Sequence, residues 1–399
     1  MRKAKLDGTH LLLEATSNQV NQAGGYTGMT PAIFRDYVHG IATEVKFDPS
    51  LLILGGDHLG PNPWQNLDAA TAMIHAVEMV RVYVEAGFTK IHLDASMRCA
   101  DDPTIVLDEV MAERAAALCS AAESARARLG LAPVVYVIGT EVPTPGGATH
   151  SLDTLEVTSC DAAERTLEVH RKAFHDLGLN RAWERVIAMV VQPGVEFDHD
   201  SVVDYDAAKA NHLQGFLRDH AELVMEAHSS DYQKPHAYDE LVRDGFSILK
   251  VGPALTFALR ETLYALAAME RELVPANKLS NLVEAMESIM LANPANWQKY
   301  YRGSAEEQRR LRVYSYSDRI RYYWRFGEVE ASVARLLRNL QQAEIPETLL
   351  SQYCPRQYDE VRAGTLTKDP KELVIANVRT VLGMYSRGLP RQRFEALSG

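Results

Sequence analysis

Seven short apolar runs, separated by longer segments of helical period, organise most of the chain. The runs are rich in Val, Ile and Leu and do not alternate strictly with polar residues, which is typical of parallel strands covered on both faces. They span residues 11–16, 51–57, 90–96, 134–141, 186–194, 223–230 and 248–253. Segments of helical period span residues 69–88, 109–130 and 162–178. A glycine ends each of these helical segments, as a helix-to-strand connection requires. The pattern predicts a series of βα units.

Almost every predicted strand ends in a chemically useful side chain. These residues are Glu14, Asp57, Asp94, Glu141, Gln192, His228 and Lys250. A closed barrel gathers such side chains at one mouth, whereas a doubly wound open sheet concentrates its site near a switch point. We therefore expect a (β/α)8 TIM-type barrel. Only seven strands are visible, so either the first βα unit is missing from this chain or one strand is hidden in the C-terminal part.

The strand signals stop after about residue 275, and the remaining sequence has helical period. We expect a barrel domain over residues 1–274 and a helical C-terminal extension over residues 275–399, packed on the barrel or used for assembly. We also expect an oligomer. The string SYSDRIRYYW in this extension could bring Asp318, Arg319 and Arg321 to a ligand or a neighbouring subunit, although charged helical residues are usually solvated.

Composition narrows the class of protein. The net charge of −11 argues against a nucleic-acid surface, which needs a concentrated basic face. No apolar stretch approaches the roughly 18 residues of a membrane span. The four cysteines are widely spaced without a CxxC motif, as expected for reduced thiols, so we expect a cytoplasmic protein.

The string GGDHLGPN places Asp57 and His58 side by side where a strand ends. Neighbours on a regular strand point to opposite faces, so the two glycines and the turn must let both side chains reach the mouth. In MEAHSSDYQ, His228 occupies a similar position. The two histidines could hold one divalent ion, such as Zn²⁺, with an oxygen from Glu141 or Gln192 completing the site. The alternative is an ordinary cap in which Asp57 accepts backbone N–H groups.

The string KIHLDAS alternates, so His92, Asp94 and Ser96 should share one face of a strand. Asp94 and Ser96 lie nearest the mouth and are candidates to contact a ligand. His92 lies deeper, and we interpret it as a core histidine. Together with Asp57, the carboxylates of Asp94 and Glu141 are our candidates for acid–base catalysis.

Substrate-binding candidates come from three other segments. Lys250 and Gly252 lead from a strand into a helix, and a helix N-terminus beside a glycine and a lysine is a natural phosphate seat. The alternative is a tight βα turn. Asn18, in the polar loop 17–31, suits sugar hydroxyls because its amide both donates and accepts. Ser229 follows His228 in the next loop.

Several long strings together closely resemble the GatZ/KbaZ family of D-tagatose-1,6-bisphosphate aldolase subunits. They are GGDHLGPN, KIHLDAS, GTEVPTPGG, VVQPGVEFDH, MEAHSSDYQ, LKVGPALTFALRE and YSDRIRYYW. The resemblance extends from about Leu11 to the C-terminus. It implies a (β/α)8 barrel related to the class II, metal-dependent aldolases. It also implies one more strand–helix unit ahead of Leu11, in agreement with the count of seven strands.

The resemblance implies roles for individual residues. Asp57 would move the proton of the C4 hydroxyl, while His58 and His228 would ligate the metal. The aldolases use three histidines, but the corresponding strand here ends in Gln192. The metal site is therefore expected to be altered, or completed by Glu141.

The resemblance implies a component of a tagatose-bisphosphate aldolase that supports cleavage of a ketose phosphate to triose phosphates in tagatose or galactitol catabolism. Its expected partner is a class II catalytic subunit. Two alternatives stay open, a metal-dependent C4 epimerase of fructose and tagatose phosphates and a non-catalytic stabilising subunit. An older family label, tagatose-6-phosphate kinase, is disfavoured because the chain has no GxxxxGK[ST] motif and no kinase catalytic loop.

Overall fold

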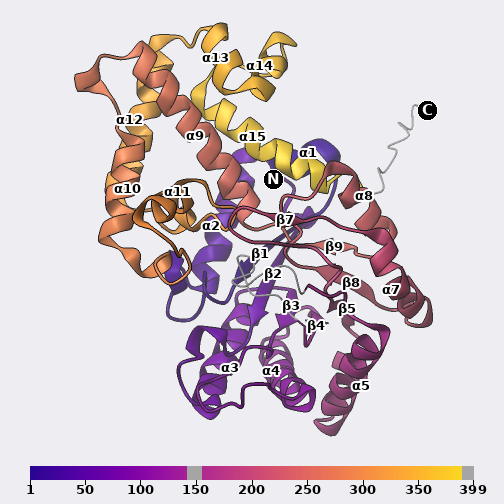
Figure 1. The fold of residues 1–399 in the computed structure, drawn as a ribbon. Helices are drawn as coiled ribbons and strands as arrows, with labels where there is room; N and C mark the ends of the chain where they lie inside the picture. The colour runs from indigo at the N-terminus through magenta and orange to yellow at the C-terminus, as the bar shows by residue number, and fades with distance from the viewer. Residues whose placement is uncertain (142–154, 389–399) are drawn as a thin grey trace, which may run out of the picture.

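A parallel seven-stranded sheet forms the centre of the molecule (Figure 1). The structure is a computed structural model and describes residues 1–141 and 155–388. The strand order is β1-β2-β3-β4-β5-β8-β9. The bounds are β1 (Leu11–Thr16), β2 (Leu52–Leu59), β3 (Lys90–Leu93), β4 (Val135–Ile138), β5 (Val186–Val190), β8 (Val224–Ala227) and β9 (Ile248–Leu249). The predicted runs therefore all contain strands, and all neighbouring strands are parallel.

The sheet curls until side chains from its first and last strands meet. Lys250, directly after β9, forms an ion pair with Glu14 of β1. Within the described residues, however, β1 and β9 each pair with a single neighbouring strand. The seven expected strands are thus present, and they form a curled, unclosed sheet rather than a complete eight-stranded barrel.

Helices connect the strands and cover the outer face of the sheet (Figure 1). They are α2 (Pro31–Val45), α3 (Ala69–Glu85), α4 (Asp108–Leu129), α5 (Cys160–Asp176), α6 (Asn180–Trp183), α7 (Ala207–Asp219) and α8 (Pro235–Arg243), while α1 (Arg2–Asp7) precedes β1. Side-chain caps fix several helix starts, since Asp68 accepts from the N–H of Thr71 before α3 and Ser159 accepts from that of Ala162 before α5. Gly130, in the left-handed conformation, ends α4.

Short elements complete this half of the chain. The antiparallel pair β6 (Glu196–Phe197) and β7 (Val202–Val203) follows β5 and was not expected from the sequence. Single 3-10 turns occur at η1 (Gly25–Thr27), η2 (Pro49–Leu51) and η3 (Asn62–Trp64).

The C-terminal part is helical. Its elements are α9 (Pro253–Leu273), η5 (Ala276–Lys278), α10 (Leu282–Ala292), η6 (Pro294–Asn296), α11 (Ala305–Tyr314), η7 (Arg319–Tyr322), α12 (Gly327–Ala343), α13 (Glu347–Tyr353), α14 (Pro355–Arg362) and α15 (Pro370–Tyr385). These helices share a hydrophobic cluster with α9, separate from the cluster between the sheet and its helices. Figure 1 shows α15 packed along α9 and beside α1. No helix in the described ranges is both long and apolar enough to cross a bilayer.

Candidate metal centre

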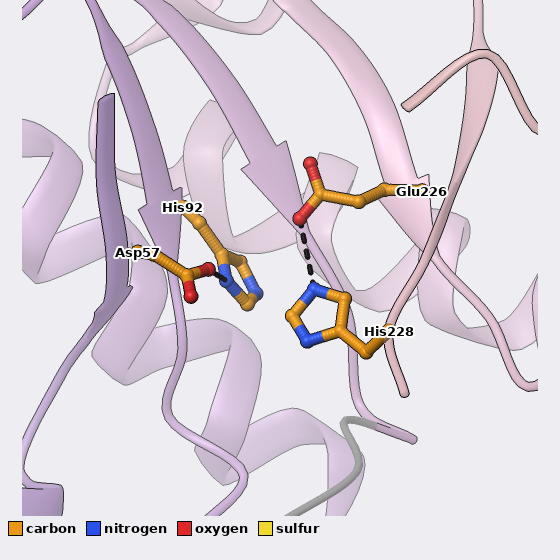
Figure 2. A group of neighbouring side chains, drawn as sticks. All are labelled: Asp57, His92, Glu226 and His228. Atoms are coloured by element: carbon orange, nitrogen blue, oxygen red, sulfur yellow. Dashed lines mark hydrogen bonds and ion pairs between the residues drawn. The ribbon is translucent and has the colours of Figure 1, made fainter. Parts of the chain in front are cut away.

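Four buried side chains from three strand ends converge inside the curled sheet. They are Asp57 of β2, His92 of β3, and Glu226 and His228 at the end of β8. One potential ligand atom from each residue lies within 4.8 Å of the other three. Figure 2 shows the two carboxylates and the two imidazoles facing one another. We call these residues the four-residue cluster.

The chemistry of the four-residue cluster fits a divalent metal ion. The Nδ1 atom of His92 lies 3.1 Å from Oδ1 of Asp57, and Nε2 of His228 lies 2.8 Å from Oε1 of Glu226. Imidazole nitrogens and carboxylate oxygens are the ligands that Zn²⁺ and similar ions take. The Nε2 atom of His92 is buried and has no hydrogen-bond partner among the described residues. A metal ion would give this orphaned nitrogen a partner.

Local backbone geometry delivers Asp57 and His58 to the same place. The register between β2 and β3 shifts between Gly56 and Leu59, and His58 has a φ of 48°, which is uncommon for a residue other than glycine. Gly60 then passes so close to β3 that an added Cβ would lie 1.6 Å from the carbonyl oxygen of Asp94. Asp57 and His58, although neighbours in sequence, both line the same cavity.

His58 lies beside the four-residue cluster rather than in it. Its Nδ1 is 2.7 Å from Oδ2 of Asp94, and its Nε2 is 3.6 Å from Oδ2 of Asp57. Burial alone would lower the pKa of His58, but the two carboxylates outweigh burial and raise that pKa to about 9. The same contacts lower the pKa values of Asp57 and Asp94 despite their burial. His58 therefore bridges the carboxylates of Asp57 and Asp94.

Two lysines lie within ion-pair distance of Glu14, Asp57 and Glu226. The Nζ atom of Lys90 lies 2.6 Å from Oε1 of Glu14 and 2.5 Å from Oε2 of Glu226. The Nζ atom of Lys250 lies 2.8 Å from Oδ1 of Asp57 and also pairs with Glu14. Burial raises the pKa of Glu226, but Lys90 and His228 outweigh it and lower the value to about 2. Burial lowers the pKa of Lys250 well below its ordinary value.

A cavity of about 440 Å³ opens beside the four-residue cluster. Asp57, His58, His228, Ser229 and Lys250 are among the residues that line it, together with residues of α1, β1 and α15. The volume of the cavity is in the lower part of the range typical of small-molecule sites, and it is large enough for a small phosphorylated sugar.

The expected phosphate seat is occupied by protein groups. Gly252 lines the cavity, but its N–H and that of Ala254 both donate to Oδ1 of Asp231, at 2.9 Å each. Asp231 thus caps the N-terminus of α9. Lys250, the other half of the expected seat, is engaged by Glu14 and Asp57.

Four other predicted residues make local contacts away from the four-residue cluster. Oε1 of Gln192 accepts the backbone N–H groups of Gly194 and Val195 at 2.8 and 3.0 Å. The exposed Glu141 accepts from the hydroxyl of Thr158, and residues 142–147 of its loop lie outside the described residues. The hydroxyl of Ser96 donates to Asp94. Asn18 is exposed, and its carbonyl accepts from Tyr26.

Two members of the four-residue cluster were not among the ligands expected from the sequence. His92 was interpreted as a core histidine, although its strand period placed it on the same face as Asp94. Glu226 was recognised as sharing a face with His228, but it was not assigned a role. The available signal was the two-residue period of a strand. His92 precedes Asp94 by two residues, and Glu226 precedes His228 by two residues, so each shares a face with a residue that was selected.

Comparisons with known proteins identify the family. Residues 1–389 match the model of the family described as D-tagatose-1,6-bisphosphate aldolase subunit GatZ/KbaZ-like. A crystal structure described as a probable tagatose 6 phosphate kinase from Sinorhizobium meliloti 1021 is similar, with 48% identity, coverage of 98% of this chain and 96% of that chain, and a TM-score of 0.90.

A more distant similarity concerns the fold alone. The glycerol complex of fructuronate-tagaturonate epimerase UxaE from Cohnella laeviribosi has 13% identity, with coverage of 98% of this chain and 78% of that chain and a TM-score of 0.50. The family match is stronger evidence, because it spans nearly the whole sequence. The chain therefore belongs to the GatZ/KbaZ-like family of D-tagatose-1,6-bisphosphate aldolase subunits.

Proposed function

We propose that the protein is a subunit of a D-tagatose-1,6-bisphosphate aldolase that supports retro-aldol cleavage of a ketose phosphate to triose phosphates, together with a class II catalytic subunit. The family match over residues 1–389 supports this role over the C4-epimerase alternative. The structural observation that carries the proposal is the buried four-residue cluster beside a cavity of about 440 Å³. Cleavage of this kind takes place in tagatose or galactitol catabolism.

We further propose that the four-residue cluster binds a divalent ion, with Zn²⁺ favoured by its nitrogen and oxygen donors. Such an ion, when bound, supplies Lewis-acid chemistry at a ketose oxygen. Asp57 is our candidate to accept the proton of the C4 hydroxyl. Lys250 Nζ and His58 Nε2 lie 2.8 and 3.6 Å from its two oxygens and orient it. Asp94 fixes His58 through its 2.7 Å contact.

We propose that the curled seven-stranded sheet and its helices form most of a (β/α)8-type barrel within residues 1–274. The helices beyond would then form a C-terminal extension. Ser229 lines the cavity and is our candidate for contact with a substrate hydroxyl.

Metal content tests the site directly. Protein purified without chelators, together with His92→Ala, His228→Ala and the exposed control His175→Ala, would be titrated with Zn²⁺ by calorimetry and analysed by mass spectrometry for bound metal. We expect about one ion per chain in the parent and in His175→Ala, and a loss of affinity of at least about 10-fold in the other two variants. Equal metal content in all four proteins would remove the four-residue cluster as the metal site.

Activity assays separate the three functions. The protein would be incubated with tagatose 1,6-bisphosphate, alone and with a class II aldolase catalytic subunit, while triose phosphates and the C4 epimer are measured. We expect triose phosphates, with the rate raised by the partner and lowered in His228→Ala. Epimer formation without cleavage would favour the epimerase. Full stimulation by His228→Ala would make the protein a stabilising subunit whose cluster is not used.

A further inference from the structure

The last residue of β1 carries a hydroxyl group that no other described residue engages. This residue is Thr16, which is half-buried and lines the cavity. Its Oγ1 atom forms no hydrogen bond with any residue in the described ranges. By contrast, the hydroxyls of Ser96 and Ser230, which follow β3 and β8, donate to Asp94 and to the carbonyl of Lys250. Thr16 therefore offers a free polar atom to a ligand in the cavity.

The strand period directs the side chain of Thr16 into the curled sheet. Glu14, two residues earlier on β1, reaches inward, since its Oε1 lies 2.6 Å from Nζ of Lys90. Ala15, between the two, packs in the hydrophobic cluster between the sheet and its helices. Because side chains two residues apart on a strand share a face, Thr16 faces the same interior as Glu14.

The register between β1 and β2 places Thr16 beside Asp57. Their Cα atoms are directly paired, and neighbouring strands lie about 4.8 Å apart. Both residues line the cavity. His92, the other neighbour of Asp57, belongs to β3 on the far side of β2 (Figure 2). Thr16 therefore flanks Asp57 on the side opposite to His92.

Hydrogen bonds to the backbone hold Thr16 in position. Its N–H donates to Oε1 of Gln19 at 3.0 Å, and its carbonyl accepts from the N–H groups of Gln19 and Val20 at 2.9 and 3.1 Å. A β-branched side chain is also restricted in χ1. The hydroxyl is thus held in place before a ligand arrives, which lowers the entropy cost of binding.

The direction from His92 through Asp57 to Thr16 matches the order of groups along a ketose. In the proposed cleavage, the C2 carbonyl oxygen belongs at the four-residue cluster and the C4 hydroxyl at Asp57. The C5 hydroxyl then lies on the far side of C4 from C2. Thr16 lies on the corresponding side of Asp57, so its hydroxyl is the protein group placed to meet the C5 hydroxyl.

We propose that the Thr16 hydroxyl hydrogen-bonds to the C5 hydroxyl of the ketose phosphate and makes the site selective for substrates that carry this group. The inference rests on the proposed function, which supplies the class of substrate and the role of Asp57. A threonine hydroxyl both donates and accepts, so it suits another hydroxyl. An apolar side chain at this position would leave the C5 hydroxyl without a partner after it has lost its water.

Calorimetric titration of the Zn²⁺-loaded full chain with two unreactive ligands tests the proposal. One ligand is the hexitol bisphosphate made by reducing the C2 carbonyl of tagatose 1,6-bisphosphate, and the other is the same compound without the C5 hydroxyl. Neither ligand can be cleaved, because the carbonyl is gone. The proteins are the parent, Thr16→Val, Thr16→Ser and the matched control Thr9→Val, since Thr9 lines the same cavity ahead of β1.

The parent should bind the ligand with the C5 hydroxyl about 3- to 10-fold more tightly than the ligand without it, as expected for one neutral hydrogen bond. Thr16→Val, which has nearly the same shape, should lose this preference. Thr16→Ser and Thr9→Val should keep it. The affinity for Zn²⁺ should be the same in all four proteins, because Thr16 is not a member of the four-residue cluster.

Equal binding of the two ligands by the parent overturns the proposal. A preference that persists in Thr16→Val, or that is also lost in Thr9→Val, overturns it as well, and so does weaker Zn²⁺ binding in Thr16→Val. If Thr16→Val fails to fold, Thr16→Ala takes its place in the same comparison. A preference that depends on Thr16, without triose phosphate formation from tagatose 1,6-bisphosphate, refutes the proposed function alone. Absence of binding of either ligand to the parent overturns both.

Discussion

Lys90 offers the sharpest test of the buried charge network. The residue is 2% exposed, and its Nζ atom lies between Glu14 and Glu226, at 2.6 and 2.5 Å. Lys90→Met keeps a side chain of similar length and removes the charge. The fully buried Glu226 then loses its lysine partner at 2.5 Å, which is a far larger perturbation than loss of a surface ion pair.

The magnitude follows from the burial of the pair, since the side chains of Lys90 and Glu226 are 3% and 0% exposed. Interactions with Lys90 and His228 lower the pKa of Glu226 from the ordinary 4.5 to about 2 despite burial. Breaking a buried pair by removing one partner typically costs about 3–5 kcal/mol. We therefore expect the free energy of unfolding at pH 7 to fall by about 3–5 kcal/mol in Lys90→Met.

The sign of the pH dependence gives a second check. In the parent, the folded-state pKa of Glu226 lies below 4.5, so its contribution is complete above pH 4.5 and is lost as the pH falls toward 2. Without Lys90, burial should raise that pKa above 4.5, so the variant should gain stability as the pH falls. The difference between the two proteins should therefore shrink between pH 7 and pH 5.

Urea unfolding, followed by circular dichroism at pH 5, 6 and 7, measures both effects. Lys172→Met is the matched control, because Lys172 forms an exposed pair with Asp176 and should change stability by at most about 1 kcal/mol. A loss in Lys90→Met below about 1 kcal/mol at every pH would refute the reasoning. A loss that grows as the pH falls would contradict the assignment of Glu226.

Two further predictions concern stability. Burial raises the pKa of Asp231 from the ordinary 3.8 to about 6, so its charge destabilises the fold as the pH rises through this range. Asp231→Asn should therefore unfold at higher urea than the parent above pH 6, by up to about 3 kcal/mol, and match it near pH 4; a less stable variant at pH 8 would contradict this. Gly60→Ala, whose Cβ would meet the Asp94 carbonyl at 1.6 Å, should lose at least about 1–3 kcal/mol in the same assay. Gly40→Ala, with open space in α2, should gain about 0.5–1 kcal/mol, and an equal loss in both glycine variants would remove the steric argument.

The helices and strands could be predicted from the sequence because their signals are local. The run 11–16 coincides with β1, and the segment 109–130 differs from α4 by one residue at each end. Apolar runs and helical periods act over a few residues, so they need no knowledge of the rest of the chain. The hairpin of β6 and β7 was missed because two-residue strands carry no periodic signal.

The site was predicted less well because it depends on register between strands. The pattern within β3 cannot tell that His92 lies level with Asp57, since the irregular step after Gly56 decides which residues of β2 and β3 face each other. The sequence also does not show which side chains occupy the backbone N–H groups that a ligand would use. A helix N-terminus beside Gly252 looks like a phosphate seat until Asp231 is found to occupy it.

Residues 315–322 lie late in the chain but contact loops formed much earlier. They leave the ribosome after every strand of the sheet, yet segments after β1, β5, β8 and β9 contact them. We therefore expect the loops at the strand ends to reach their final arrangement only after the C-terminal helices have been synthesised. A nascent chain halted within α10 would carry all four members of the four-residue cluster without these contacts.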